Sequence, residues 1–240
     1  MKIALIHGQT HKGSSYNMGR LIADKIKGEK EISEFFLPRD LDRFCLGCYR
    51  CLKGDENCPF YAEKRVLLDA LDAADVLIFT TPTYCMHASA PMKSFLDLTF
   101  TRWMSHRPAG CMFRKRALVV STAAGAGADG AVKDIKQALR YWGVPCVLGY
   151  GKAIQAMNWD MVSAKNKAKI ERDIQRLSRR LSAQTPPRAG LWTRMTFLMM
   201  RMMQQAGWGS DPCEAEYWRS MGWMGKARPW KTQKGTTEHV

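Results

Sequence analysis

The first segment that can do chemistry is Gly8–Asn17, with the sequence G-Q-T-H-K-G-S-S-Y-N. It lies between a short apolar strand expected at Lys2–His7 and an amphipathic helix whose apolar positions begin at Met18. A loop in this position turns backbone N–H groups and the positive end of a helix dipole toward an anion, usually a phosphate. Neither G-x-G-x-x-G nor G-x-x-x-x-G-K-[ST] occurs in it, so it matches no dinucleotide or nucleoside-triphosphate fingerprint.

The loop is instead rich in side chains that form hydrogen bonds, which suits one terminal phosphate monoester. These side chains are Thr10, Ser14, Ser15, Tyr16 and Asn17, with His11 and Lys12 beside them. The alternative is an ordinary strand-to-helix turn in which a serine caps the helix. We interpret the loop as a phosphate cradle and keep the serine cap as the alternative.

A second candidate site is a run of four cysteines with the spacing C-x2-C-x2-C-x6-C, followed by a proline. The cysteines are Cys45, Cys48, Cys51 and Cys58. Closely spaced thiolates followed by proline are typical of ferredoxin-type ligation, although the last spacer there is three residues. Four thiols can also bind zinc tetrahedrally, and they can equally remain plain thiols. All three interpretations stay open.

Strands and helices alternate over the first 150 residues and must position these loops. After the first strand, further strands are expected at Glu31–Phe36, Asp75–Thr80, Arg116–Ser121 and Pro145–Gly149. Apolar residues at helical spacing, such as Leu67 and Leu71, predict helices between them. This pattern predicts an α/β fold: a doubly wound parallel sheet of five strands in the flavodoxin-like order 2-1-3-4-5. We assign residues 1–150 to this domain.

Three loops are expected to converge at the carboxyl ends of these strands, where ligands bind in such sheets. The first is Gly8–Asn17. The second, Pro82–His87, offers exposed backbone and an aromatic ring, and the third, Ala123–Gly127, lets a flat ring approach the backbone. A planar, phosphorylated cofactor fits all three loops, and FMN is the candidate.

Residues 151–240 are predicted to form a helical extension that is basic and rich in Met and Trp, and that packs on the domain or on a second subunit. Ile170, Ile174, Leu177 and Leu181 mark a basic amphipathic helix, and Leu191–Gln205 is a Met-rich segment also expected to be helical. Methionines at helical spacing usually pack in a core or against a partner. An interfacial membrane helix is the alternative.

The formal net charge is +15, and much of it lies on the basic helix. A nucleic-acid binder is one explanation, but we favour a solvated basic face that attracts small anions, because no stacking aromatics alternate with the basic residues. No apolar run is long enough for a membrane span, and the amino terminus does not match a signal peptide. We therefore expect a cytoplasmic protein with no nucleic-acid or membrane partner, whose eight cysteines form no disulfides.

With these loops, the chain resembles the flavodoxin-like NAD(P)H-dependent oxidoreductases, a family that includes NADPH-dependent FMN reductases and iron–sulfur flavoproteins. The resemblance covers residues 2–150 and rests on I-H-G-Q-T-H-K-G-S-S-Y, C-L-G-C-Y-R-C-L-K-G-D-E-N-C-P, T-P-T-Y-C-M-H-A-S-A-P-M-K-S-F-L-D and S-T-A-A-G-A-G. It implies FMN as the cofactor and NAD(P)H as the electron donor. We also expect a homodimer or higher homo-oligomer, in which a second subunit completes the edge of the flavin site. The chain departs from the family pattern at Gln9 and His11.

Carried over by position, the resemblance implies that FMN contacts come from the same three loops. The implied contacts are Gln9, Thr10, His11, Ser14, Ser15 and Tyr16 in the first loop, Pro82, Thr83, Tyr84, Cys85, Met86 and His87 in the second, and Ala124, Gly125, Ala126 and Gly127 in the third. No catalytic side chain is expected, because hydride passes directly between nicotinamide and flavin.

The expected function is therefore an FMN-dependent NAD(P)H oxidoreductase that passes hydride to a small acceptor such as a quinone, a nitroaromatic compound or a flavin. The alternative is an iron–sulfur flavoprotein that acts as an electron carrier. In that case Cys45, Cys48, Cys51 and Cys58 would hold a 4Fe–4S cluster.

Overall fold

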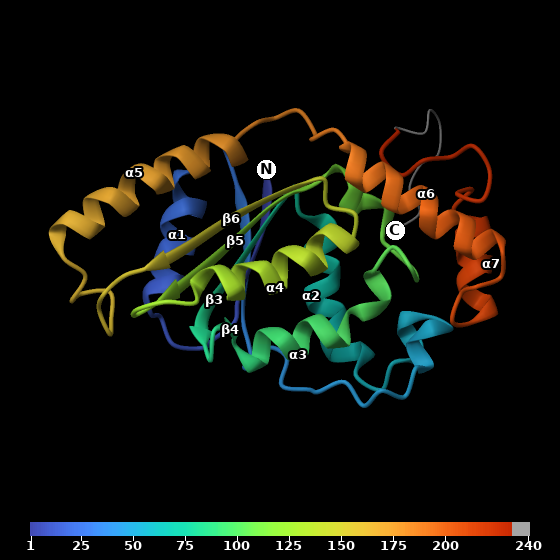
Figure 1. The fold of residues 1–240 in the computed structure, drawn as a ribbon, viewed down its shortest axis with the longest axis horizontal. Coiled ribbons are helices and arrows are strands. Elements are labelled where there is room, and N and C mark those ends of the chain that lie inside the picture. The colour runs from blue at the N-terminus through green and yellow to red at the C-terminus, as the bar shows by residue number, and fades with distance from the viewer. Residues whose placement is uncertain (232–240) are drawn as a thin grey trace.

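A parallel β-sheet forms the centre of the protein, in a computed structural model that describes residues 1–231 (Figure 1). The strands are β1 (Lys2–His7), β2 (Glu31–Phe36), β3 (Val76–Tyr84), β4 (His87–Ala88), β5 (Arg116–Ala123) and β6 (Cys146–Ala153). Their order is β2-β1-β3-β5-β6, and the short β4 pairs antiparallel with β3. The predicted order of five parallel strands is confirmed, and β4 is an addition to it.

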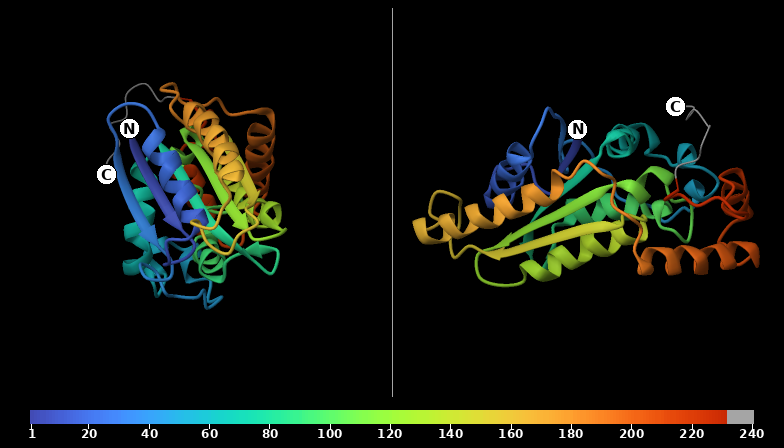
Figure 2. Two further views of the ribbon diagram at one scale, coloured as in Figure 1. Left: turned by 90° about the vertical axis from the view of Figure 1, so that its left-hand side faces the viewer. Right: turned by 90° about the horizontal axis from the view of Figure 1, so that it is seen from above.

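Helices cover both faces of the sheet (Figure 2). They are α1 (Ser14–Lys25), α2 (Tyr61–Ala73), α3 (Ala90–Leu98), α4 (Ala128–Tyr141), α5 (Ala164–Leu181), α6 (Leu191–Gln205) and α7 (Pro212–Ser220). Leu77 and Phe79 of β3 pack with α2, α3 and α4, whereas Val76 and Ile78 pack with α1 and α5. Because side chains on both faces are buried, the strand reads as one continuous apolar run.

The basic helix α5 belongs to the layer that covers the sheet. Ile170, Ile174 and Leu181 are buried in the same cluster as the apolar side chains of α1. The Ser178 hydroxyl also donates to the carbonyl oxygen of Ile22 at 3.1 Å. The Lys and Arg side chains of this helix therefore lie on its outer side, as expected for a solvated basic face.

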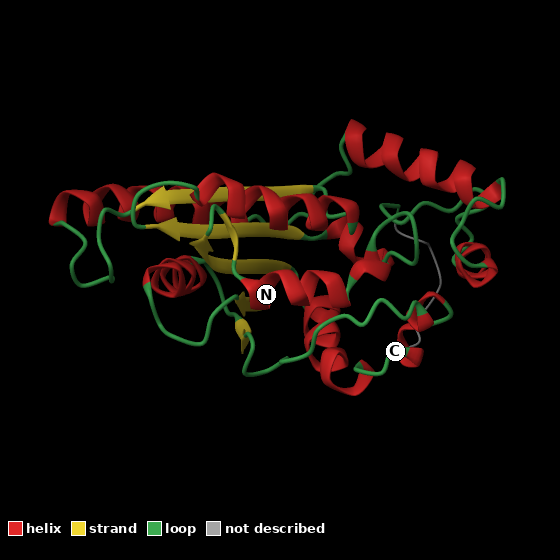
Figure 3. Cartoon of the chain, turned by 60° about the horizontal axis from the view of Figure 1, so that its bottom comes forward, coloured by secondary structure: helices red, strands yellow, loops and turns green. Residues whose placement is uncertain are grey.

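The last two helices, α6 and α7, lie beyond the amino ends of the strands (Figure 3). They form a separate cluster with the segment after α3, made of Met104, Phe113, Phe197, Met200, Trp218 and Trp223. The Trp218 indole donates to the carbonyl oxygen of His106 at 2.7 Å, and the Tyr217 hydroxyl donates to that of Pro108 at 2.7 Å. The aromatic segment of α7 is thus anchored on its own chain.

Within residues 1–231, no helix combines the length and the hydropathy needed to cross a bilayer.

Gly143 ends α4 and provides a test of how tightly this layer is packed. Its φ is +95°, and a Cβ there would lie 2.5 Å from the Phe113 ring. Gly143→Ala should lower the free energy of unfolding by about 2 kcal/mol or more, since left-handed strain and a clash with a packed ring both oppose folding. Urea-induced unfolding measures the loss.

Gly28 is the matched control, because its φ is +89° but no atom lies within 4 Å of the added Cβ. Gly28→Ala isolates the backbone strain and should lower the free energy of unfolding by only about 1 kcal/mol. Equal losses in the two variants would show that the contact with Phe113 contributes nothing.

Candidate functional site

A cavity of about 330 Å³ opens at the carboxyl ends of β1, β3 and β5. This is the sheet edge at which the three loops were expected to meet. The predicted residues that line it are Gln9, His11, Ser14, Ser15, Tyr16, Pro82, Thr83, Tyr84 and Ala124. Part of each of the three loops therefore reaches one cavity.

The start of α1 is the part of this cavity that best suits an anion. The helix begins at Ser14, inside the predicted loop, and its cap residue is Gly13, which offers no side-chain cap. The Ser14 hydroxyl oxygen is buried, lines the cavity and has no hydrogen-bond partner. An uncapped helix N-terminus beside an unsatisfied hydroxyl fits a phosphate group. The serine cap considered as the alternative is not formed.

The neighbouring hydroxyl, Ser15 Oγ, is used within the protein. It lies 2.7 Å from Thr122 Oγ1 and donates to the Thr81 carbonyl oxygen at 3.1 Å. The Ser15 hydroxyl proton is thus used in a hydrogen bond to the sheet, whereas the Ser14 hydroxyl is free to bind a ligand. Close by, a Cβ at Gly19 would overlap the Thr80 methyl group, so the lack of a side chain lets α1 approach β3.

A buried histidine forms the floor of the cavity and was missed from the sequence. His7 Nδ1 lies 2.7 Å from Thr80 Oγ1, and His7 Nε2 lies 2.9 Å from Glu34 Oε1. Burial lowers the pKa of His7 from its ordinary value of 6.5, against the raising effect of Glu34. The sequence signal for His7 was its place as the last residue of an apolar strand, because ligands bind at the carboxyl ends of such strands. The rings of Tyr16 and Phe36 flank it at 4.9 and 4.6 Å between centroids.

The second loop turns partly away from the cavity. Cys85 and Met86, with φ of 48° and 69°, form the turn of the β3–β4 hairpin, in which Tyr84 pairs with His87. A Cβ added at Gly127 would lie only 2.6 Å from the Met86 sulfur. The hairpin therefore packs on the start of α4, and Cys85, Met86 and His87 do not line the cavity. His87 instead contacts Asp134 of α4 at 3.1 Å.

The remaining differences from the expected site lie at its margins. Thr10, Gly125, Ala126 and Gly127 do not line the cavity. The Thr10 N–H donates to the Gln9 side chain at 2.9 Å, and Gly127 caps α4. The lining residues that were not predicted are His7, Gly13, Thr80, Thr122, Ala123, Ile154, Ala156, Met157 and Asn158. The last four of these residues follow β6. The end of that strand was predicted at Gly149 but lies at Ala153, so the sequence analysis did not place the residues after it at the cavity.

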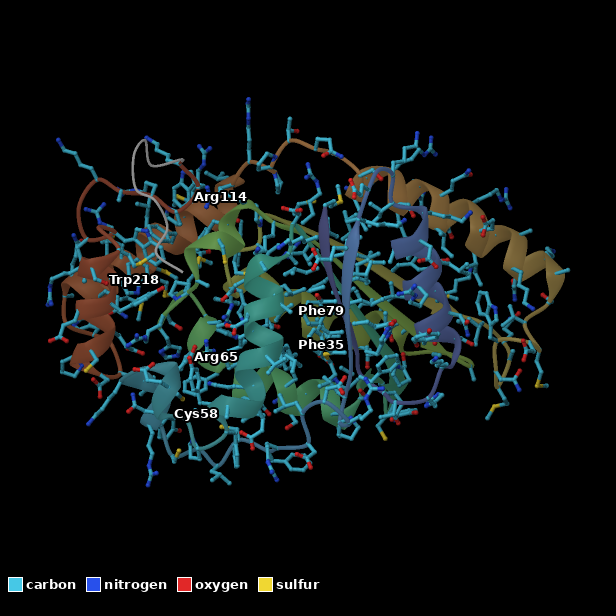
Figure 4. All side chains as sticks on the ribbon, turned by 180° about the vertical axis from the view of Figure 1, so that it is seen from behind. Phe35, Cys58, Arg65, Phe79, Arg114 and Trp218 are labelled. Atoms are coloured by element: carbon cyan, nitrogen blue, oxygen red, sulfur yellow. The ribbon has the colours of Figure 1, made fainter. Side chains whose placement is uncertain are left out.

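The four-cysteine loop does not assemble the metal site that two of its three interpretations required. Among residues 1–231, no three His, Cys, Asp or Glu side chains gather as metal ligands. Cys45 and Cys48 are exposed, whereas Cys51 is buried, and burial raises its pKa to about 11, which disfavours a thiolate. None of the four lines the cavity, and Cys58 lies toward the end of the molecule that carries Trp218 (Figure 4). All eight cysteines of the chain are free thiols.

One family gives a clear match to the chain: the sequence model of NADPH-dependent FMN reductase matches residues 1–157. Two curated relatives share 29% identity with it. One is an iron-sulfur flavoprotein from Archaeoglobus fulgidus, aligned over 98 residues that cover 40% of this chain and 48% of the relative. The other is a probable NADPH:quinone oxidoreductase 2 from Oryza sativa subsp. japonica, aligned over 140 residues that cover 57% and 63%. The alignments thus span about half of the first relative and under two-thirds of the second.

Solved structures share the fold. An FMN-dependent NADH-azoreductase from Bacillus anthracis, solved in complex with FMN, has a TM-score of 0.57 at 12% identity. The match covers 76% of this chain and 100% of the azoreductase. At this identity, the similarity establishes the flavodoxin-like arrangement and nothing finer.

The lowered pKa of His7 predicts how the stability of the protein changes with pH. The unfolded chain binds more protons than the folded one near pH 6, so the free energy of unfolding falls as pH drops below about 6.5. We expect His7 to add a slope of at most about 1.4 kcal/mol per pH unit to the free energy of unfolding as the pH falls through 6.5. Urea unfolding measured between about pH 7.5 and 5.5 should show that the free energy of unfolding depends less steeply on pH in His7→Gln than in the wild type. The same slope in both proteins would contradict a neutral buried His7.

Proposed function

The chain belongs to the NADPH-dependent FMN reductase family, and from this premise we propose that it is an FMN-dependent NAD(P)H oxidoreductase. It passes hydride from NAD(P)H through FMN to a small-molecule acceptor such as a quinone, a nitroaromatic compound or a flavin. The observation that carries the proposal is the start of α1, where the unpartnered Ser14 hydroxyl and an uncapped helix end face one cavity.

This helix start would hold the FMN phosphate. The free Ser14 hydroxyl would donate to it, and the backbone N–H groups of the first turn and the helix dipole would add to the attraction. Lys12, which is exposed, adds positive charge beside this helix start, and His11 lines the cavity next to it. Tyr16, Thr83, Tyr84 and Ala124, which line the same cavity, would contact the rest of the cofactor.

Bound FMN supplies the two-electron chemistry, and the protein supplies binding and orientation. The chain positions the wall of the cavity through hydrogen bonds that link β1, β2 and β3. His7 holds the Thr80 hydroxyl at 2.7 Å and is itself held by Glu34. Buried groups that are fixed in this way cannot rotate to follow a ligand, so they preserve one cavity shape.

The electron-carrier alternative is less favoured. It has support from the name of the Archaeoglobus relative, but a 4Fe–4S cluster needs four thiolates gathered around it. In this chain Cys45 and Cys48 are exposed, Cys51 is buried with a raised pKa, and none of the four lines the cavity. Hydride transfer at FMN is therefore the function that we propose.

Two further features belong to the same proposal. Tyr84 and Met157 stand at the rim of the cavity and are 47% and 84% exposed, and a second subunit that covered them would make a homodimer. Eight free thiols match the reducing conditions of the cytoplasm, which is where NAD(P)H is available as a donor.

Ser14→Ala tests the phosphate contact. Loss of a hydrogen bond to a charged group should weaken FMN binding about tenfold, which corresponds to about 1.4 kcal/mol. Ser220→Ala, at the far end of α7, is the matched control and should bind FMN as the wild type does. Titration of the protein into FMN, followed by flavin fluorescence, measures both dissociation constants.

The activity itself is tested anaerobically. NAD(P)H should bleach the visible absorbance of protein-bound FMN, and an added quinone should restore it. A protein that binds no added FMN would overturn the proposal, as would a bound flavin that NAD(P)H leaves oxidised.

A further inference from the structure

The outer face of α6 is an exposed apolar stripe. Its large side chains are Leu191, Met195, Leu198, Met199 and Met202, which are 78%, 60%, 37%, 52% and 68% exposed. The opposite face, with Phe197 and Met200, is buried against α7 and the segment after α3. The methionines therefore divide between a packed face and an open one. An apolar surface of this extent on a folded chain indicates an interaction site.

The charge near this stripe is positive. The chain between residues 184 and 210 contains no Asp or Glu, and Arg194 on α6 and Arg188 just before it are exposed. Arg201 is turned inward instead and donates to the Met224 carbonyl oxygen at 2.9 Å. A partner that is complementary to this surface has negative charge and an apolar region that can bury the exposed side chains.

The stripe continues into a cationic groove on α4. Trp192, at the start of α6, lines a groove of about 560 Å³ together with Lys133, Lys136 and Arg140. One carboxylate, that of Asp129, also lines it. Figure 2 shows α4 and α6 along the same side of the molecule, so the groove and the stripe can meet one extended surface.

We propose that this side of the protein binds the surface of an anionic lipid bilayer. The outer face of α6 enters the boundary between headgroups and acyl chains, and the cations of α4 and α6 contact the anionic headgroups. Trp192 and Trp208 stand near the two ends of α6, and Trp208 is 74% exposed. Indole rings are favoured at this depth of a membrane.

Other occupants match the surface less well. In a two-fold dimer the same patch of each subunit would meet, which would bring Arg194 of both copies together in molecules of net charge +15. A nucleic acid offers negative charge but no apolar phase for methionine and leucine side chains. The sequence analysis kept an interfacial membrane helix only as the alternative for this segment, because the sequence does not reveal which face of α6 is covered.

Flotation of the full-length protein with lipid vesicles tests the proposal. With phosphatidylcholine vesicles that contain roughly one-third phosphatidylserine at about 0.1 M salt, the protein should float, whereas with phosphatidylcholine alone it should stay at the bottom. The triple variant Met195→Gln, Met199→Gln and Met202→Gln should bind at least about tenfold more weakly, since three apolar side chains no longer enter the lipid.

The matched control is Val66→Gln with Met161→Gln, which changes two similarly exposed side chains, one on α2 and one just before α5. It should bind vesicles as the wild type does. Lys133→Gln with Arg140→Gln should weaken binding about tenfold, and so should about 0.5 M salt. Circular dichroism and retained FMN binding establish that each variant is folded. If the triple variant does not fold, the single variant Met202→Gln takes its place in the flotation experiment.

Several outcomes would overturn the proposal. They are no flotation with anionic vesicles, flotation that the triple variant retains, and equal flotation with neutral vesicles. Light scattering adds a fourth: a wild-type dimer that the triple variant converts to monomers would show that a second copy covers α6. NADPH oxidation measured without vesicles should be unchanged in the triple variant, so the membrane proposal and the proposed activity can fail separately.

Discussion

The attachment of α1 to the sheet is the interaction on which the site depends. Ser15 hydrogen-bonds Thr122 on β5 and the Thr81 carbonyl on β3, so two strands fix where the helix begins. With Ser15 held inward, Ser14 is left at the cavity with no protein partner. One hydroxyl therefore holds the scaffold and its neighbour remains available to a ligand. The N-terminus of α1 points at the cavity before a ligand binds, and this preorganisation lowers the free-energy cost of ordering the site on binding.

The fold could be predicted because apolar runs and helical spacing are local signals. The run that forms β3 and the buried stripe of α4 both appear in the sequence, and they fix the alternation that defines the sheet. The position of each loop followed from this alternation. What each loop residue faces did not, because it depends on tertiary contacts. Met86, for example, packs on the start of α4, where Gly127 and Gly130 leave room for it. In the same way, cysteine spacing did not reveal that Cys51 is buried while Cys45 is exposed.

The candidate cavity and the last two helices lie at opposite ends of the sheet. The cavity occupies the carboxyl ends of the strands, whereas α6 and α7 are fastened at the amino ends by Trp218 and by a 2.6 Å contact between His106 and the fully buried Glu214. A buried carboxylate with a close partner holds this junction in one geometry. Because the sheet lies between the two ends, the extension can meet a large surface without covering the cavity.

Gly19 has an effect that reaches past its own helix. With a hydrogen as its side chain, it leaves room for the Thr80 methyl group, and the hydroxyl of the same threonine is bound to His7 on the cavity floor. Any larger residue would act as a wedge between α1 and β3, and the displacement would pass through Thr80 to that floor. A position of α1 that does not itself line the cavity therefore helps to set the depth of that cavity.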